Sequence, residues 1–210
     1  MKHMLTLVML LIGSYAVHAQ DAQAKTILDK TVAKIKAYPA VEITFELAME
    51  NKAENIKESH SGKAYMKDTM YRIEVMDVIN YFDGKTIYTY MPDAEEVNLK
   101  NPDEGQEELL NPTILFNIHN ERFNQKLIDN QNGLAYIELT PKTPHKQITK
   151  IGVWIDTKKE AVQKVISYGK DGNDVIIVIK ELKQPEKTLD IKFFQFDSTT
   201  HPNVEVVDLR

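Results

Sequence analysis

Residues 41–50 read VEITFELAME, and their alternation indicates the class of fold. Val41, Ile43, Phe45 and Leu47 are separated by single polar or small residues, so the large apolar side chains recur at every second position. A period of two places them on one face of a β-strand. A strand with one apolar and one wet face is typical of an antiparallel sheet that packs one side on a core.

The alternation returns at short intervals along the chain. Tyr71, Ile73 and Val75 share a second strand face, and Asp83-Gly84 predicts a hairpin because both residues suit tight turns. About 11 strands are predicted, at residues 41–50, 62–67, 71–75, 78–82, 86–91, 96–99, 134–140, 148–156, 161–168, 175–182 and 189–196. The polar residues 51–55 form a plausible hairpin loop. Closely spaced strands joined by hairpins predict a curved sheet, a sandwich or a barrel.

One amphipathic helix is predicted before the sheet, at residues 21–37. Its apolar stripe consists of Ala24, Ile27, Leu28, Val32 and Ile35. Lysines and Asp29 occupy the other faces, and Pro39 ends the helix because the residue before a proline is pushed towards extended geometry. The chain is therefore expected to belong to the α+β class.

A second helical segment is predicted to interrupt the strands. Residues 101–112 are acidic and flanked by prolines, and residues 113–119 are expected to form a short helix. Its apolar side chains Ile114, Leu115, Phe116 and Ile118 are too many for one narrow stripe, so some should face a partner element or a ligand space. We predict a hinged lid over the apolar face of the sheet. The alternative is a fixed helix that completes the core.

Composition excludes several classes of protein. The 210 residues are expected to form one domain, and the formal net charge of -5 does not suit a nucleic-acid binder. Because the chain has no cysteine, disulfides, thiolate metal sites, cysteine nucleophiles and an acylated N-terminal cysteine are ruled out.

The N-terminus has the pattern of a signal peptide. Lys2 is followed by residues 5–12, which are apolar apart from Thr6, and Val17-His18-Ala19 has the small-x-small form of a signal-peptidase site. The apolar run is short for a membrane span of about 20 residues. We predict a signal peptide at 1–19, a mature domain at 20–210 and export of the protein.

No catalytic constellation is visible. The histidines do not have metal-ligand spacing, and no nucleophile elbow or phosphate loop is present, so we expect neither an enzyme nor a cofactor or metal. Acidic residues at 93–96 and 103–108 are more simply solvated loops than glycosidase acids. The notable supply is aromatic and aliphatic. These aromatic and aliphatic residues form a core, an apolar ligand-binding space or both, and composition alone does not distinguish these possibilities.

A set of motifs resembles a known family. Residues 83–92, DGKTIYTYMP, look like the hairpin of the periplasmic outer-membrane lipoprotein carrier family, LolA. Gly62-x-Ala64-x-Met66, residues 111–115 (NPTIL), residues 139–142 (LTPK) and the tail from Phe194 to Val206 resemble further family segments in the same order. After the second strand the family commonly has a basic residue followed by proline, and its arginine helps to hold the lid. Lys67-Asp68-Thr69 stands in that region here, without arginine or proline.

The resemblance implies both a fold and a function. The fold would be an unclosed, strongly curved antiparallel β-barrel with an N-terminal helix and a short helical lid over its apolar face. The protein would take acylated lipoproteins from an inner-membrane exporter, shield their acyl chains in the periplasm and deliver them to an outer-membrane acceptor, as a monomer. The expected lipid-binding residues are Val41, Ile43, Phe45, Leu47, Met66, Tyr71, Ile73, Val75, Ile114, Leu115 and Ile118.

Three other functions remain open from the sequence. The first is a periplasmic lipid-sensing or regulatory module of the same fold, although regulatory relatives usually carry a second domain. The second is an exported hydrolase. The third is an outer-membrane receptor of this fold, which the absence of an acylated cysteine disfavours.

Overall fold

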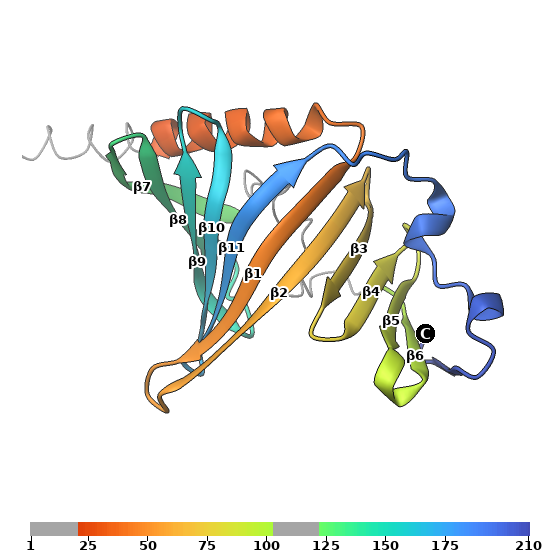
Figure 1. Cartoon of the computed structure of the whole chain (residues 1–210). Coiled ribbons are helices and arrows are strands. Elements are labelled where there is room, and N and C mark those ends of the chain that lie inside the picture. The colour runs from red at the N-terminus through yellow and green to blue at the C-terminus, as the bar shows by residue number, and fades with distance from the viewer. Residues whose placement is uncertain (1–20, 103–121) are drawn as a thin grey trace, which may run out of the picture.

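The computed structural model describes residues 21–102 and 122–210 (Figure 1). These residues form an α-helix at 21–36 and one 12-stranded sheet that curls without closing. The predicted signal peptide, the acidic stretch from 103 onwards and the lid helix with Ile114, Leu115 and Ile118 lie outside the described residues. The α+β class and the unclosed, curved sheet are confirmed.

The strands follow the hairpin order expected from the sequence. They are β1 (Val41–Asn51), β2 (Ile56–Lys67), β3 (Met70–Val75), β4 (Val78–Phe82), β5 (Ile87–Met91), β6 (Glu96–Lys100), β7 (Phe123–Gln131), β8 (Leu134–Pro141), β9 (Ile148–Asp156), β10 (Ala161–Gly169), β11 (Asn173–Lys183) and β12 (Glu205–Asp208). Three short 3-10 helices, Pro92–Ala94, Ile191–Phe194 and Ser198–Thr200, lie between or after them. The hairpin loop predicted at 51–55 is confirmed, and β2 begins earlier than expected.

The spatial order of the strands is β12-β6-β5-β4-β3-β2-β1-β11-β10-β9-β8-β7. The first strand lies in the middle, because β1 pairs antiparallel with both β2 and β11. Bulges interrupt the register after Thr44, Leu127 and Val162, and bulges of this kind bend a strand and increase its twist. In the described part of the chain, β7 and β12 form the two ends of the sheet and do not pair with each other.

The structure corrects the strand assignment in three places. Residues 189–196 are not a strand: Asp190 caps a 3-10 helix by accepting a hydrogen bond from the Phe193 backbone amide, and Ile191 is 55% exposed. Two strands were missed, β7 and β12. The sheet is also not wholly antiparallel, because β12 pairs parallel with β6.

The helix lies across the concave side of the sheet, near the ends of β8 to β11 (Figure 1). Its predicted stripe is confirmed, since Ala24, Leu28, Val32 and Ile35 are buried. The last turn closes when the Tyr38 amide donates to the Ile35 carbonyl, directly before Pro39. The helix packs its apolar stripe into the same cluster as the buried residues of β1 to β3 and of β8 to β10.

The hairpin at Asp83-Gly84 is held by one carboxylate. Gly84 has φ +96, and Asp83 Oδ1 accepts hydrogen bonds from the backbone amides of Lys85 at 2.9 Å and Thr86 at 2.8 Å. Partial burial raises the pKa of Asp83, but these amides and the Tyr88 hydroxyl outweigh it, so the pKa lies below its ordinary value of 3.8.

We expect Asp83→Ala to destabilise the protein at pH 7 and to matter less in acid. A carboxyl with a lowered pKa in the folded state binds fewer protons there than in the unfolded chain, so its stabilisation is complete above pH 3.8 and disappears as the pH falls through the folded pKa. Melting curves of both proteins from neutral pH down to an acidity well below the ordinary aspartate pKa check this. A difference in melting temperature that is constant across this range would contradict it.

Candidate functional site

The concave face of the sheet carries one continuous apolar surface. All eight predicted lipid-binding residues that the structure describes are buried in a single cluster on this face: Val41, Ile43, Phe45, Leu47, Met66, Tyr71, Ile73 and Val75. Strand register brings them together, because Val41 lies opposite Met66 and Tyr71 lies beyond Met66 on the next strand. Side chains opposite each other on paired strands share a face of the sheet.

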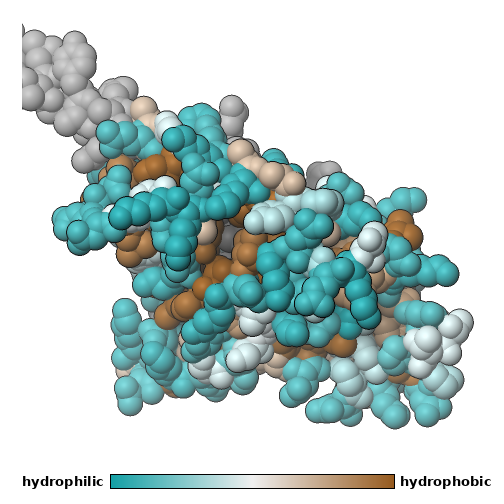
Figure 2. Space-filling view, turned by 45° about the horizontal axis from the view of Figure 1, so that its top comes forward, coloured by the Kyte–Doolittle hydropathy of each residue, from teal (hydrophilic) through white to brown (hydrophobic). Residues whose placement is uncertain are grey.

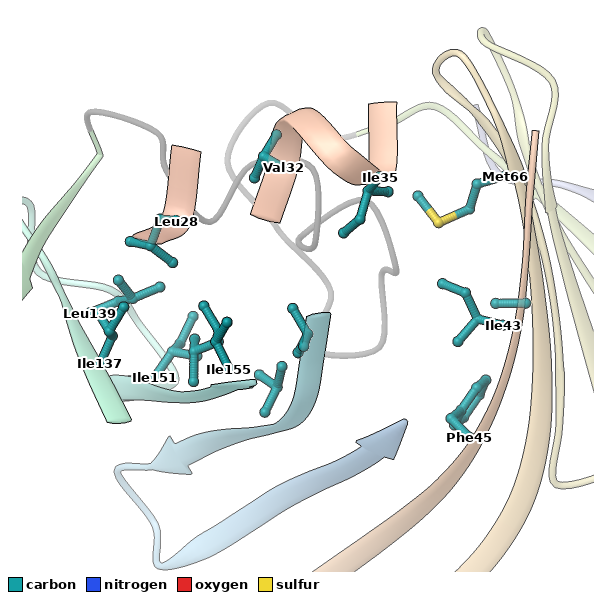
Figure 3. Packing of buried hydrophobic residues seen from close by; sticks show 14 of the residues in the cluster. Leu28, Val32, Ile35, Ile43, Phe45, Met66, Ile137, Leu139, Ile151 and Ile155 are labelled. Carbon is teal, nitrogen blue, oxygen red and sulfur yellow. The ribbon is translucent and has the colours of Figure 1, made fainter. Parts of the chain in front are cut away.

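A second wall of the same cluster was not identified from the sequence as part of the site. It is formed by Ile137, Leu139, Ile151, Val153, Ile155, Val162 and Val165 on β8 to β10. Figure 3 shows Leu28 of the helix beside Leu139 and Ile151, whereas Ile43, Phe45 and Met66 come from the opposite wall. The sequence of these strands alternates with a period of two, which predicted the strands themselves. The alternation did not indicate that their apolar faces point towards β1 to β3.

Strand β11 joins the two walls. Its residues 175–179 read VIIVI, which leaves apolar side chains on both faces of the strand. Ile177 lies opposite Leu47 and Ile179 lies opposite Phe45, and both pack partly buried against the cluster. The apolar lining thus runs without interruption from β3 across β1 and β11 to β8.

The lining opens into a cavity of about 350 Å³ beside the end of the helix. Ile35, Tyr38, Val162, Ile179 and Leu182 supply its apolar walls. This volume lies within the usual range of small-molecule pockets, about 300–1,000 Å³. A space-filling view shows hydrophobic side chains in a hollow with hydrophilic residues around it (Figure 2).

Charged residues form the rim of this cavity. Lys34 donates from Nζ to the Lys159 carbonyl, and Lys180 forms an ion pair of 2.6 Å with Glu46. The Lys180 ammonium, hydrogen-bonded to the Glu46 carboxylate, keeps the pKa of that carboxyl below 4.5. The cavity is therefore lined by both charged and apolar side chains.

One polar side chain lies next to this lining. His60 is opposite Leu47 on β2, and its Nε2 is buried without a hydrogen-bond partner among the described residues. Lys67, at the end of β2, donates from Nζ to the Leu189 carbonyl at 2.6 Å. Lys67 thus holds the segment after β11 against β2.

Phe45 packs flat across Gly62 on the neighbouring strand. A Cβ at residue 62 would lie 2.4 Å from Phe45 Cζ and 2.7 Å from its Cε2. Distances this short force the ring to move. Gly62 is therefore the position that lets the Phe45 ring line the site.

We expect Gly62→Ala to destabilise the protein by about 1–3 kcal/mol, the usual cost of overpacking. In a Phe45→Leu background the same change should cost much less, because the shorter side chain leaves room for the methyl group. Urea unfolding of the four proteins, followed by fluorescence of the single tryptophan, Trp154, measures this. Equal costs in both backgrounds would show that the ring contact is not the cause.

Two chemical features are absent from the residues that the structure describes. Residues 21–102 and 122–210 contain no group of three or more histidine, aspartate or glutamate side chains placed to hold a metal ion. In the same ranges, no helix is long and apolar enough to cross a membrane.

Comparisons with known proteins agree with this architecture. The sequence profile of the family "Outer membrane lipoprotein carrier protein LolA" matches residues 78–197. No curated protein matches the chain significantly.

Similar solved structures are distant in sequence. An uncharacterized conserved protein from Thermus thermophilus has a TM-score of 0.57 at 11% identity, over 89% of this chain and 99% of that one. A putative outer membrane lipoprotein-sorting protein domain from Vibrio parahaemolyticus has a TM-score of 0.48 at 12% identity, over 82% and 97% of the two chains. A LolA superfamily protein from Nitrosomonas europaea has a TM-score of 0.46 at 12% identity, over 82% and 97%. The Thermus likeness shows a shared fold and nothing about activity.

Proposed function

Since this chain belongs to the LolA family of outer membrane lipoprotein carrier proteins, we propose that it is a periplasmic chaperone that binds the acyl chains of lipoproteins and carries them to the outer membrane. Its partners are an inner-membrane exporter that supplies acylated lipoproteins and an outer-membrane acceptor that receives them. The protein acts as a monomer and without catalysis.

The observation that carries this proposal is the continuous apolar face. Eight of the expected acyl-contacting residues come from three adjacent strands and pack in one cluster, which a cavity of about 350 Å³ adjoins. An acyl chain is apolar along its length, and its burial contributes about 0.8 kcal/mol per methylene. A surface that extends across several strands fits such a ligand better than a compact pocket would.

Release of the cargo requires that burial be incomplete. A saturated chain that was fully sealed would be held too tightly to hand over, because the contributions of the methylenes add. The unclosed sheet and the soft Met66 side chain in the lining suit an adaptable site. As part of the same proposal, Ile114, Leu115 and Ile118 form a lid that covers this face and contacts the acyl chains.

Export is the first testable part of the proposal. The apolar residues 5–12 and Val17-His18-Ala19 should direct secretion and cleavage. N-terminal sequencing of the periplasmic protein should therefore start at Gln20 or within two residues of it. Cell-associated protein that retains Met1 would contradict this prediction.

A binding assay tests the carrier function. The purified mature protein, residues 20–210, is mixed with a triacylated cysteinyl peptide or with the same peptide without acyl chains, and a fluorescent fatty acid reports displacement. We expect displacement by the acylated peptide alone, and transfer of that peptide to acceptor vesicles of phosphatidylethanolamine and phosphatidylglycerol. Failure of the acylated peptide to bind would overturn the proposal.

A further inference from the structure

Along one row of residues on the concave face, the side chains change from apolar to polar between β3 and β4, whereas Phe82 and Ile87 in the neighbouring row are apolar. One row of paired residues crosses seven strands: Ile43, Ala64, Ile73, Asn80, Thr89, Asn98 and Val207. All of them share one face of the sheet, since directly paired residues point to the same side. The row is apolar as far as Ile73 on β3, and the next three residues, on β4 to β6, are polar.

The opposite face of β4 to β6 is the buried one. Tyr81, Tyr90 and Val97 alternate with the polar residues and form a separate apolar cluster with Phe196 and Val204 of the C-terminal segment. Phe196 lies 5.0 Å from Tyr90, centroid to centroid. This segment covers the convex side, and on the concave side of these strands Asn80, Thr89 and Asn98 are half-buried.

The three polar residues keep unused hydrogen-bonding groups. Thr89 Oγ1 donates to Asn80 Oδ1 at 2.8 Å, and Asn98 Nδ2 donates to Glu96 Oε1 at 2.7 Å. Among the described residues, Asn80 Nδ2 then has no acceptor and Asn98 Oδ1 has no donor. A donor and an acceptor are therefore free two strands apart, roughly 10 Å at the usual strand spacing.

We propose that Asn80, Thr89 and Asn98 bind the peptide that follows the acylated residue of the cargo. We call these three residues the polar row. A peptide backbone presents both N–H and C=O groups, whereas the ester groups of an acyl chain only accept hydrogen bonds. The polar row supplies a free donor and a free acceptor, so it matches the peptide and not the esters alone. Ile73 places the polar row next to the acyl-binding face, in the order in which a lipopeptide passes from chain to peptide.

This inference rests on the proposed carrier function and adds a reason why the protein would select acylated peptides over other lipids. Acyl chains alone would bind at the apolar lining as well as any lipid of the same length. Hydrogen bonds to the first peptide groups would favour acylated peptides over free fatty acids or diacylglycerol. The effect of each such bond on affinity is modest, because the bond replaces one that the free groups make with water.

The test uses Thr89→Val, which keeps the shape of the side chain and removes the hydroxyl that orients the Asn80 amide, and Asn80→Leu combined with Thr89→Val, which also removes the free Asn80 Nδ2 donor. The mature full-length protein is titrated with three ligands: palmitate, dipalmitoylglycerol and a triacylated cysteinyl tetrapeptide. We expect the single variant to bind the lipopeptide about three- to tenfold more weakly, and the double variant more weakly still. The affinities for palmitate and dipalmitoylglycerol should stay unchanged. Thr44→Val is the matched control, because Thr44 lies on the opposite face of β1, between Ile43 and Phe45.

Each outcome separates the two proposals. If the unmodified protein binds none of the three ligands, the carrier function itself fails. If it binds all three and the double variant changes none of the affinities, the polar row is a solvated surface and the inference is overturned while the carrier function stands. An equal loss for dipalmitoylglycerol and the lipopeptide would assign the contact to the esters and overturn the peptide assignment.

Discussion

Replacing Ile73 by glutamate is expected to abolish the loading of acylated cargo. Ile73 lies in the middle of the concave face, between Ala64 on β2 and Asn80 on β4, and is 4% exposed. Neither Ala64 nor Asn80 could pair with a carboxylate at this position by charge. Burying an unpaired charge is strongly unfavourable. The same charge would stand in the path of an acyl chain. Titration with a triacylated cysteinyl peptide measures the loss.

Two controls separate the site from the fold. Thr44→Glu places the same charge on the opposite face of β1, between Lys63 on β2 and Glu181 on β11, and should leave loading intact. Ile73→Leu keeps the apolar volume and should bind cargo with little change. Circular dichroism and Trp154 fluorescence establish whether each variant is folded. A folded Ile73→Glu protein that still loads cargo normally would exclude Ile73 from the site.

Truncation of Leu28 to alanine is expected to cost about 2–5 kcal/mol of stability, the usual range for a buried leucine. Leu28 is fully buried at the centre of the helix stripe and packs beside Leu139 and Ile151 (Figure 3). Its removal leaves a cavity between the helix and the wall formed by β8 to β10. Urea unfolding followed by Trp154 fluorescence gives the change in the free energy of unfolding.

The control for the helix is Lys30→Ala, on its exposed side. This change should alter stability by less than about 0.5 kcal/mol, as is usual for surface positions. A loss for Leu28→Ala no larger than that for Lys30→Ala would mean that the helix does not hold the sheet. Increased binding of an apolar dye by the Leu28 variant would indicate that loosening the helix exposes the concave face.

The sequence predicted the elements whose pattern is local. The stripe of the helix, the alternation in β1 and β3 and the turn at Asp83-Gly84 depend only on neighbouring residues, because a period of 3.6 or of two defines a face without knowledge of the partner. The eight described residues that were predicted to bind lipid lie on such apolar faces of β1, β2 and β3. Strand pairing, and not the alternation alone, brings these faces together.

Local pattern failed where tertiary contacts dominate. Strand β7 buries only Phe123 and Leu127 and has no regular alternation, so its pairing with β8 was not visible. Strand β12 exists because it adds to the edge of β6 in parallel, and its Val206 is 50% exposed. Residues 189–196 alternate like a strand, but the Asp190 cap and the burial of Phe194 favour a 3-10 turn.

The direction of each face was decided by the tertiary structure alone. Both β3 and β4 alternate between polar and apolar residues. In β3 the apolar Ile73 lies on the concave face and Arg72 on the convex face, whereas in β4 the polar Asn80 lies on the concave face and Tyr81 is buried on the convex face. Alternation states that a strand has two different faces, but it does not state which one is inside. That choice depends on what covers the sheet: the helix and the facing strands on the concave side of β1 to β3, and the C-terminal segment on the convex side of β4 to β6. Apolar side chains turn towards whichever cover removes them from water, so the polar row lies beside the apolar lining only because the chain folds its end back over the other face.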